Sequence, residues 1–391
     1  VFTKKYGYWV SEIKKLQEEK LQEKETVSII NTDFVKSLNE RDSMLGVIIP
    51  KSVTSIEKHS FQMCKSLLSV LIPNSVTSIG GGAFQGCIKL QEVVIPNSVI
   101  SIGKWIFNEC KSLQEVTIPN SVTSIGEGAF DNCVSLREVV IPNSVISIGN
   151  RTFNECSSLQ VVTIPASVTS IEKHSFRMCE SLLSVLIPNS VTSIGVGAFQ
   201  GCKSLQEVVI PTSVTSIGNW TFNDCKSLQE VTIPASVTSI GVGTFQDCIK
   251  LKEVKIPTSL TSIGGIAFDG CASLTDVSIP TSVTSIGEGA FSHCYLLRYV
   301  SIPKLVSISD TTFMYCKSLT EVSIPTSVTR IGHHAFYGCT SLNEVLIPES
   351  VTIIGTSAFN GCTSLAEVSI PESVTNIGES AFWRGTDLKI K

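Results

Sequence analysis

The stretch LQEVTIPNSVTSIGEGAFDNC, residues 113–133, sets a pattern that recurs from about residue 44 to the last residue of the 391-residue chain. All fifteen prolines, from Pro50 to Pro371, occupy one position of this pattern, and all fourteen cysteines occupy another. Successive prolines are 23 residues apart, except for one interval of 22 between Pro303 and Pro325. A strict period of this length predicts stacked supersecondary units, none of which can bury its own apolar face alone.

The first half of the repeated unit is predicted to form a short strand. Leu113, Val116 and Ile118 are expected to point inward, while Glu115 and Thr117 alternate outward. The proline that follows is tolerated because it falls at the end of the strand, where no ladder donor is needed. Stacking of successive units then predicts a parallel sheet.

The second half of the unit is predicted to be extended and then to turn. Val122 and Ile125 are inward candidates in a β-branched segment. Gly126 marks a tight bend, which prefers glycine without requiring it because other coils carry Glu or Ser there. The spacing of Phe130 and Cys133 predicts one turn of α or 3₁₀ helix on an outer wall.

The cysteine column has three interpretations. Small buried thiols fill a core and act as weak donors, adjacent thiols could be oxidised, or the thiols could bind metal. We favour core filling, because a uniform ladder serves every coil equally and chemistry needs one special place.

Composition excludes several functional classes. Apolar residues make up 42% and charged residues 16% of the chain, which fits a continuous narrow core and argues against disorder. The net charge of −4 leaves no basic footprint for nucleic acid or anionic lipid. No apolar run approaches the roughly 18 residues of a membrane span, so no membrane insertion is expected. No signal peptide is visible, and a processed or truncated start remains open.

Residues 1–43 differ from the array at 44–391, which holds about fifteen units. A helix is predicted over residues 8–24, and Thr32 or Asp33 could cap a second short helix. We interpret this segment as a helical cap over the first coil; the alternative is a docking helix for a partner. At the other end Gly385 replaces the expected cysteine, and an open end there is either paired with a partner or marks a truncated sequence.

Taken together, the unit L-x-E-V-x-I-P-x-S-V-T-S-I-G-x-x-A-F-x-x-C resembles the 23-residue leucine-rich repeats of the BspA-like or treponemal type. The resemblance covers about residues 44–391, with Pro, Gly, Ala-Phe and Cys at matching offsets. It implies a leucine-rich-repeat solenoid with strands on the concave side. It also implies a surface-exposed or secreted protein that binds other proteins or cells, with no catalytic residues to transfer.

An acidic position before the strand valine is the first candidate binding feature. The sequence predicts an acidic ridge on the strand side, and we single out Glu207, Glu230 and Glu253 as partner-binding residues. The alternative is a solvated face balanced by nearby lysines. Repulsion between neighbouring carboxylates about 5 Å apart is only about 0.8 kcal/mol in water, so no metal is needed to hold them.

Breaks in the pattern provide the second candidate. The shortened unit follows directly on Tyr295, Arg298 and Tyr299, and Tyr315 lies within it. Aromatic and arginine side chains are favoured interface anchors, so these four residues are the best single patch. Neutral drift in a tolerant repeat is the alternative.

Two further pairs of residues leave alternatives open. Trp105 and Trp220 share one position of the unit, where an indole could contact a partner or lie flat on the wall. Asn150 and Asn219 begin Asn-x-Thr sequons, which matter only in a eukaryotic secretory pathway and can also arise by chance.

Catalysis finds little support in these residues. His293 beside Cys294 cannot easily aim at its neighbour, and His333 with His334 lacks a third ligand at a motif spacing. We therefore expect a non-enzymatic solenoid without a cofactor, which binds a protein partner at the cell surface or after secretion. The rival hypothesis is a scaffold or spacer inside an intracellular assembly, docked through the N-terminal helix or the open C-terminal end.

Overall fold

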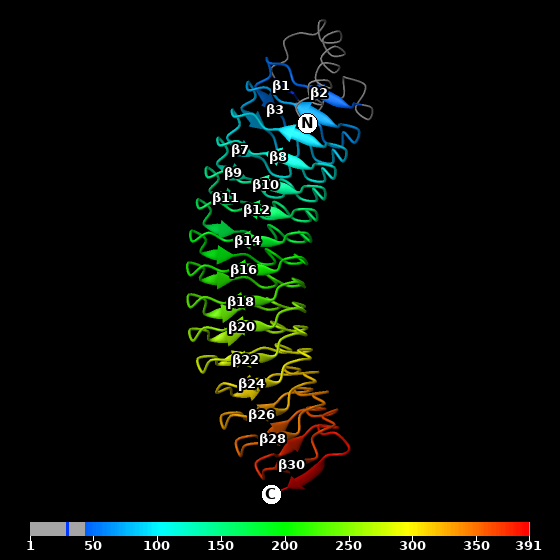
Figure 1. The fold of residues 1–391 in the computed structure, drawn as a ribbon, viewed down its shortest axis with the longest axis vertical. Coiled ribbons are helices and arrows are strands. Elements are labelled where there is room, and N and C mark those ends of the chain that lie inside the picture. Colours follow the sequence, from blue (N-terminus) through cyan, green and yellow to red (C-terminus); the bar gives the residue numbers. More distant parts are fainter. Residues whose placement is uncertain (1–28, 31–43, 391) are drawn as a thin grey trace. The chain divides into compact units, whose positions relative to one another are not determined.

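The computed structural model of the protein describes residues 29–30 and 44–390 (Figure 1). The predicted helices at residues 8–24 and after residue 32 lie outside the described residues. The chain divides into two compact units, Val1–Leu182 and Leu183–Lys391. In both units the coils contribute one strand of three or four residues after the leucine position and one two-residue strand after the proline. The fold is a parallel β-solenoid of the leucine-rich-repeat type, as the sequence predicts.

In the first unit the strands after the leucine form one parallel ladder. Its register joins residues 23 apart, so that Glu92 pairs with Glu115 and Glu115 with Glu138. This register stacks the buried valines of successive coils over one another and leaves the flanking positions outside. The ladder consists of β2 (Gly46–Ile48), β4 (Ser69–Leu71), β6 (Glu92–Val94), β8 (Glu115–Thr117), β10 (Glu138–Val140) and β12 (Val161–Thr163).

The strands after the proline form a second face of the same unit. They pair in parallel in two groups, β1 with β3 and β5, and β7 with β9 and β11. Strand β1 pairs with β3 although it belongs to the segment predicted as a helical cap. These strands are β1 (Ile29–Ile30), β3 (Ser55–Ile56), β5 (Ser78–Ile79), β7 (Ser101–Ile102), β9 (Ser124–Ile125), β11 (Ser147–Ile148) and β13 (Ser170–Ile171).

In the second unit the ladder formed by the strands after the leucine position is interrupted three times. A continuous ladder runs from β14 to β20, followed by the separate pairs β22–β24, β26–β28 and β30–β32. These strands are β14 (Ser184–Leu186), β16 (Glu207–Val209), β18 (Glu230–Thr232), β20 (Glu253–Lys255), β22 (Asp276–Ser278), β24 (Tyr299–Ser301), β26 (Glu321–Ser323), β28 (Glu344–Leu346), β30 (Glu367–Ile370) and β32 (Asp387–Ile390).

Between β19 and β31, the pairing of the strands after the proline is interrupted once, at the shortened coil. Strand β19 pairs with β21 and β21 with β23, whereas β25 starts a new ladder with β27, β29 and β31. The Leu305 N–H bonds to the Pro303 carbonyl, two residues back. In other coils the corresponding N–H bonds to the proline carbonyl three residues back. The missing residue is thus absorbed in the turn after the proline. These strands are β15 (Ser193–Ile194), β17 (Ser216–Ile217), β19 (Ser239–Ile240), β21 (Ser262–Ile263), β23 (Ser285–Ile286), β25 (Ser307–Ile308), β27 (Arg330–Ile331), β29 (Ile353–Ile354) and β31 (Asn376–Ile377).

The outer wall is built of turns, and no helix forms in the described part of the chain. In one coil the N–H groups of Ala129 and Cys133 bond to carbonyls three residues back, and the turns carry φ near +60° at Gly128 and Asn132. A positive φ at the third residue closes a type II turn and ends any helix. The predicted helical turn at this position is therefore wrong.

Hydrogen bonds between coils explain why the turn wall replaces a helix. The N–H groups of Gly128, Phe130 and Asn132 donate to carbonyls of the following coil at 2.8–2.9 Å. In a helix these N–H groups would donate to carbonyls of their own coil. The turns leave them available for hydrogen bonds to the next coil. The backbone of the wall therefore carries the stacking as the strands do.

Close approach of neighbouring backbones, and not a positive φ, explains the preference for glycine at the bend. A Cβ at Gly126 would lie 2.8 Å from backbone atoms of the preceding coil, at Gly103 and Lys104. The slot prefers glycine because adjacent backbones approach closely there, and its φ is not positive.

Stacked phenylalanines and thiols fill the core of each unit. Neighbouring rings, such as Phe199 and Phe222, lie 5.1–5.8 Å apart and nearly parallel. Every cysteine is buried, and the thiol of Cys225 donates to the carbonyl of Phe199 in the preceding coil. Burial raises the pKa of this thiol well above its usual value, and the neighbouring Cys202 and Cys248 raise it further. These contacts support the core-filling interpretation.

Candidate functional site

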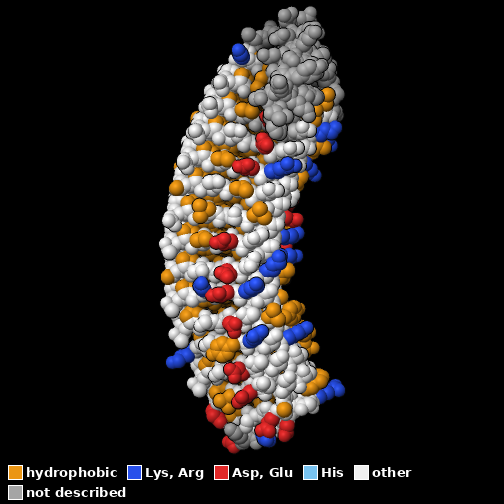
Figure 2. All heavy atoms as spheres, viewed as in Figure 1, with side chains coloured by type: hydrophobic (Ala, Val, Ile, Leu, Met, Phe, Trp, Pro, Cys, Tyr) orange, Lys and Arg blue, Asp and Glu red, His pale blue; other side chains and the backbone are white. Residues whose placement is uncertain are grey.

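The outward side chains of the strands after the leucine form a continuous face in the second unit, which we call the strand face. In each three-residue strand the central valine is buried and the two flanking side chains are wholly or partly exposed. The first position is acidic in most coils, and the third varies among apolar, hydroxyl and lysine side chains. Figure 2 shows acidic side chains recurring along this face with hydrophobic side chains beside them.

The three predicted glutamates stand at equivalent positions of adjacent strands. Glu207 pairs with Glu230, and Glu230 pairs with Glu253, in the parallel register of β16, β18 and β20. All three are exposed. The structure therefore brings Glu207, Glu230 and Glu253 together in one row, as the sequence predicts.

Lys255 modifies this row at its end. Its ammonium lies 3.8 Å from the Glu253 carboxylate, and both side chains are more than half exposed. An ion pair of this kind contributes little, since water screens it and two long side chains must be ordered. The Glu253 carboxylate thus stays accessible to another cation.

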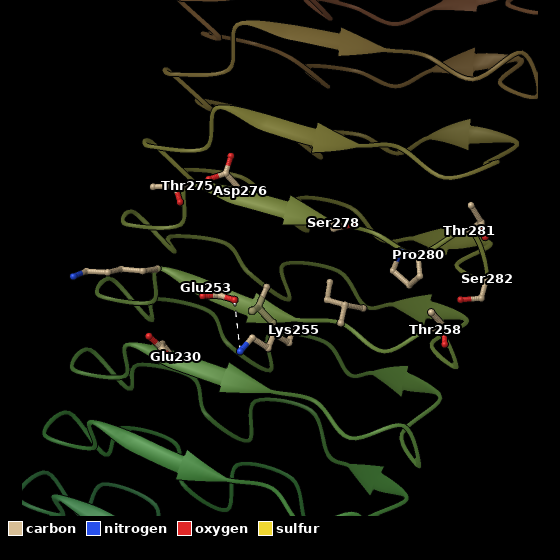
Figure 3. Close-up of a pocket in the computed structure, with 13 residues that line it drawn as sticks. Glu230, Glu253, Lys255, Thr258, Thr275, Asp276, Ser278, Pro280, Thr281 and Ser282 are labelled. Carbon is tan, nitrogen blue, oxygen red and sulfur yellow. Dashed lines mark ion pairs between the residues drawn. The ribbon is translucent and has the colours of Figure 1, made fainter.

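A groove of about 820 Å³ lies on the strand face where the ladder is interrupted between β20 and β22 (Figure 3). Its lining combines the acidic Glu230, Glu253 and Asp276 with Lys252 and Lys255. The groove could not be predicted from the sequence, because the break in the ladder depends on the spacing between coils.

Small side chains deepen this groove. The third position of the strand holds Ser278 in β22, where β14 and β16 carry Leu186 and Val209. Thr258 and Thr281, in the turns after the strands, line the far end (Figure 3). The groove thus runs from a charged end to a hydroxyl-rich end along the strands.

Tyr299 and Arg298 lie beside this groove on the next coil. Tyr299 begins β24, pairs with Asp276 in register and is 51% exposed. It therefore stands where most coils present a carboxylate. Arg298 directly precedes it and is also exposed. The strand face thus carries an aromatic side chain next to the acidic row.

Tyr295 and Tyr315 lie elsewhere, at the turns around the cysteine positions. His293 joins them, because its ring centroid is 5.9 Å from that of Tyr295 and 5.2 Å from that of Tyr315. The predicted patch of four residues is thus divided between the strand face and the turn wall. The sequence indicated His293 only as a neighbour of Cys294, although His293 and Tyr315 occupy the same slot of successive coils, which was a visible signal.

The paired tryptophans pack on the wall. The indole of Trp105 lies over Gly128 of the next coil, and that of Trp220 lies over Gly243, so that a Cβ at either glycine would meet the ring. Both tryptophans are half-buried. Of the two alternatives, the packing interpretation is the one that the structure supports.

The two sequons have exposed asparagines and buried threonines. Asn150 and Asn219 are exposed at equivalent positions of the wall. The hydroxyls of Thr152 and Thr221 are buried and donate to backbone carbonyls three residues back. In the folded protein these hydroxyls serve the turn.

The two histidine motifs are engaged in structural contacts. The Cys294 thiol donates to the Phe268 carbonyl, and burial with the neighbouring Cys316 and Asp269 raises its pKa well above the usual value. His333 accepts the N–H of Thr356 through Nδ1, whereas His334 packs against a different partner. Neither motif pairs a cysteine with a histidine base, because His293 contacts Ser292 Oγ at 2.8 Å and Asp269 at 3.0 Å, both through Nδ1. No group of three potential metal ligands occurs among the described residues.

Comparison with known proteins identifies the repeat. The chain matches the family described as BspA type leucine-rich repeat region over residues 35–160, 107–229, 146–275, 192–318 and 306–390. A leucine-rich repeat protein from Bacteroides ovatus is 29% identical with a TM-score of 0.76, over 89% of this chain and 92% of that one. A leucine-rich cell surface protein from Faecalibacterium prausnitzii is 32% identical with a TM-score of 0.52, over 86% and 87%. No protein with a curated description matches the chain. This chain belongs to the BspA-type leucine-rich repeat family.

Proposed function

We propose that the protein is a non-enzymatic binding or adhesion solenoid, which recognises a basic protein surface through the strand face of its second unit. The observation that carries the proposal is the row formed by Glu207, Glu230 and Glu253, which leads into a groove beside the exposed Tyr299. Carboxylates in register create a negative potential that steers and orients a cationic partner.

The composition of the face supports binding to a protein. Exposed apolar side chains such as Val209 and Leu346, the latter 69% exposed, stand among the carboxylates. A mixture of apolar, aromatic and charged side chains is typical of protein interfaces. The family consists of repeat solenoids that generally mediate interaction or adhesion and are not generally enzymatic.

A position at the cell surface or outside the cell fits this role. The relative from Faecalibacterium prausnitzii is described as a cell surface protein. In the described part of the chain, no helix has both the length and the apolar character to cross a membrane. Protease accessibility on intact cells of the native source tests this proposal, and resistance to protease until lysis would contradict it.

The experiment on the binding face uses charge reversal with a matched control. We expect Glu207→Lys, Glu230→Lys and Glu253→Lys together to weaken binding of an octalysine peptide by about tenfold or more, because steering by a row of charges is lost. Binding is measured by surface plasmon resonance at low salt, with octaglutamate as the negative peptide.

The matched control reverses Glu92, Glu115 and Glu138, which form the same row in the first unit. This control should retain most of the octalysine binding, because it leaves the groove of the second unit intact. Equal losses in both triple variants would show a general charge effect and overturn the assignment to the second unit.

A scaffold role is the second candidate, and one observation favours it. Strand β32 pairs with β30 alone among the described strands, and Trp383 and Leu388 beside this pair are exposed. A scaffold that docks through this surface should self-associate or bind its assembly tightly. Size-exclusion chromatography of the chain distinguishes the two roles, since a free-standing binding protein should remain monomeric.

A further inference from the structure

Five rings form a connected group at the turns of three successive coils in the second unit. We call His293, Tyr295, Tyr315, His334 and Tyr337 the aromatic patch. Tyr315 contacts His293 at 5.2 Å and Tyr337 at 5.4 Å between ring centroids, and His334 lies 5.5 Å from Tyr337. Tyr295, which is 38% exposed, completes the group through His293.

These rings replace residues of a different kind in the other coils. The slot of Tyr337 holds Gln200, Asn223 and Gln246, whose side chains hydrogen-bond to one another along the wall. Tyr337 thus replaces an amide in this column, and Ser292 and Met314 occupy the column in the two preceding coils. Tyr315 is also accommodated by its neighbour, because its ring lies over Gly338, where a Cβ would collide with it.

The patch already holds a cation. The ammonium of Lys317 lies 4.9 Å from the centroid of the Tyr295 ring. The quadrupole of an aromatic ring attracts a cation over its face, and the attraction grows when neighbouring side chains exclude water. Lys317 is exposed, so it can leave the ring without unfolding the coil.

Carboxylates border the patch on the side of the preceding coils. Asp269 lies 3.0 Å from Nδ1 of His293, so the patch is continuous with a carboxylate. Burial, and then the charges of Asp269 and Asp224, raise the pKa of Asp247, while Lys226 and His293 act in the opposite direction. A cation that reaches the rings therefore meets a complementary charge beside them.

We propose that the aromatic patch is a second binding site, separate from the strand face, which takes an arginine or lysine side chain of a partner protein. The incoming cation replaces the Lys317 ammonium over Tyr295 and lies between the tyrosine rings and the Asp269 side of the patch. This proposal is independent of binding at the strand face, because it rests on different residues on a different side of the coil.

A site-resolved measurement tests this assignment. The protein is labelled with 3-fluorotyrosine, and its ¹⁹F resonances are assigned by single Tyr→Phe substitutions. The probe is an acetylated peptide of alternating arginine and alanine, and its control replaces each arginine by citrulline, a neutral isostere. We expect the arginine peptide to shift the resonances of Tyr295, Tyr315 and Tyr337, and the citrulline peptide to leave them in place.

Tyr299 is the internal reference, since it belongs to the strand face. Charge reversal of Glu207, Glu230 and Glu253 should abolish any shift of Tyr299 and preserve the shifts of the patch. Failure of the two proposals is thus distinguishable. A response of Tyr299 alone, or equal shifts with the citrulline peptide, would overturn the aromatic site.

Substitutions that follow the repeat itself keep the fold intact. Tyr337→Asn introduces the residue that the next coil carries at the same position, Asn360, and Tyr295→Thr introduces the one found two coils later, Thr340. We expect each to weaken arginine-peptide binding about threefold to tenfold, the range of a cation–π contact. Lys317→Ala should strengthen binding, because it frees the ring of Tyr295. Weaker binding by Lys317→Ala would refute the exchange of cations.

Discussion

At the scale of single residues, a ladder of polar side chains runs along the turn wall of the first unit. Gln62 donates to Gln85, and Gln85 donates to Asn108, at 2.8–2.9 Å. Asp131 continues this column with a carboxylate that is buried, although Asn154 donates to it at 2.6 Å. A charged group thus stands in a column where Gln62, Gln85, Asn108 and Asn154 are neutral amides.

The pH dependence of stability should report this carboxylate. Burial raises the pKa of Asp131, and its carboxylate is stabilised only in part by Asn154 and Arg151. A raised folded-state pKa means that the folded protein holds the proton more tightly. The stability associated with this proton is present below the unfolded pKa of about 3.9 and is lost as pH rises through the folded pKa.

We therefore expect Asp131→Asn to increase the free energy of unfolding at pH 7, with the gap to the unsubstituted protein closing as pH falls below about 4. Urea unfolding at several pH values measures the difference. Glu138→Gln, at an exposed position of β10 in the same unit, is the control and should show a much smaller change. A variant that is less stable at pH 7 would mean that the hydrogen bonds of Asp131 outweigh its burial.

The residues of the candidate site were only partly predictable for a physical reason. The row of Glu207, Glu230 and Glu253 follows from a strict period, because any period places equal positions in one column. Contacts between different positions do not follow from it. The meeting of Tyr295, Tyr315 and His293 depends on how far each side chain reaches from its turn, and the sequence carries no direct measure of that reach.

At the scale of elements, the strands follow from the sequence and the wall does not. Alternation of valine with exposed residues specifies the strand at every coil, since one face must be buried. The spacing of Phe and Cys is compatible with one helical turn and equally with a pair of type II turns. Glu109 and Trp105 have positive φ values, although residues of these types disfavour that conformation. These values show that the wall is built of turns.

Glycine substitution distinguishes these two forms of the wall by sign. Glu109 is exposed and has φ of 60°, whereas Gly86 stands at the same position of the preceding coil. We expect Glu109→Gly to leave stability unchanged or raise it by up to about 1 kcal/mol, because glycine carries no penalty for left-handed backbone. In a helix the same change would cost about 1 kcal/mol.

The reverse substitution is the control for this prediction. Gly361 has φ of 80°, and a Cβ there would lie 3.2 Å from the backbone of Gly338. Gly361→Ala should destabilise the protein by about 1–2 kcal/mol. Thermal and urea unfolding measure both variants. A loss of stability in Glu109→Gly as large as that in Gly361→Ala would contradict the account of the wall.

At the scale of the whole molecule, the period itself is the determinant of the fold. Each coil bonds chiefly to the coils before and after it through strands and turns that repeat every 23 residues. In such an array the stability is approximately a sum of the contributions of single coils and of the interfaces between neighbours.

Deletion of one full period tests this view of the molecule. Removal of residues 92–114 joins Gln91 to Glu115, which is the residue that follows Gln in the unbroken pattern. We expect the shortened protein to keep the far-UV circular dichroism of the parent and to unfold cooperatively, because every interface that remains has a matching neighbour. Its binding of octalysine should be unchanged, since the strand face of the second unit is untouched.

Removal of residues 92–103 is the contrasting deletion, because it takes out about half a coil and joins a strand position to a turn position. Buried and exposed positions then exchange, so that polar side chains enter the core at the junction and the variant should unfold or aggregate. Equal damage from both deletions would show that individual coils, and not their period, determine whether the first unit folds.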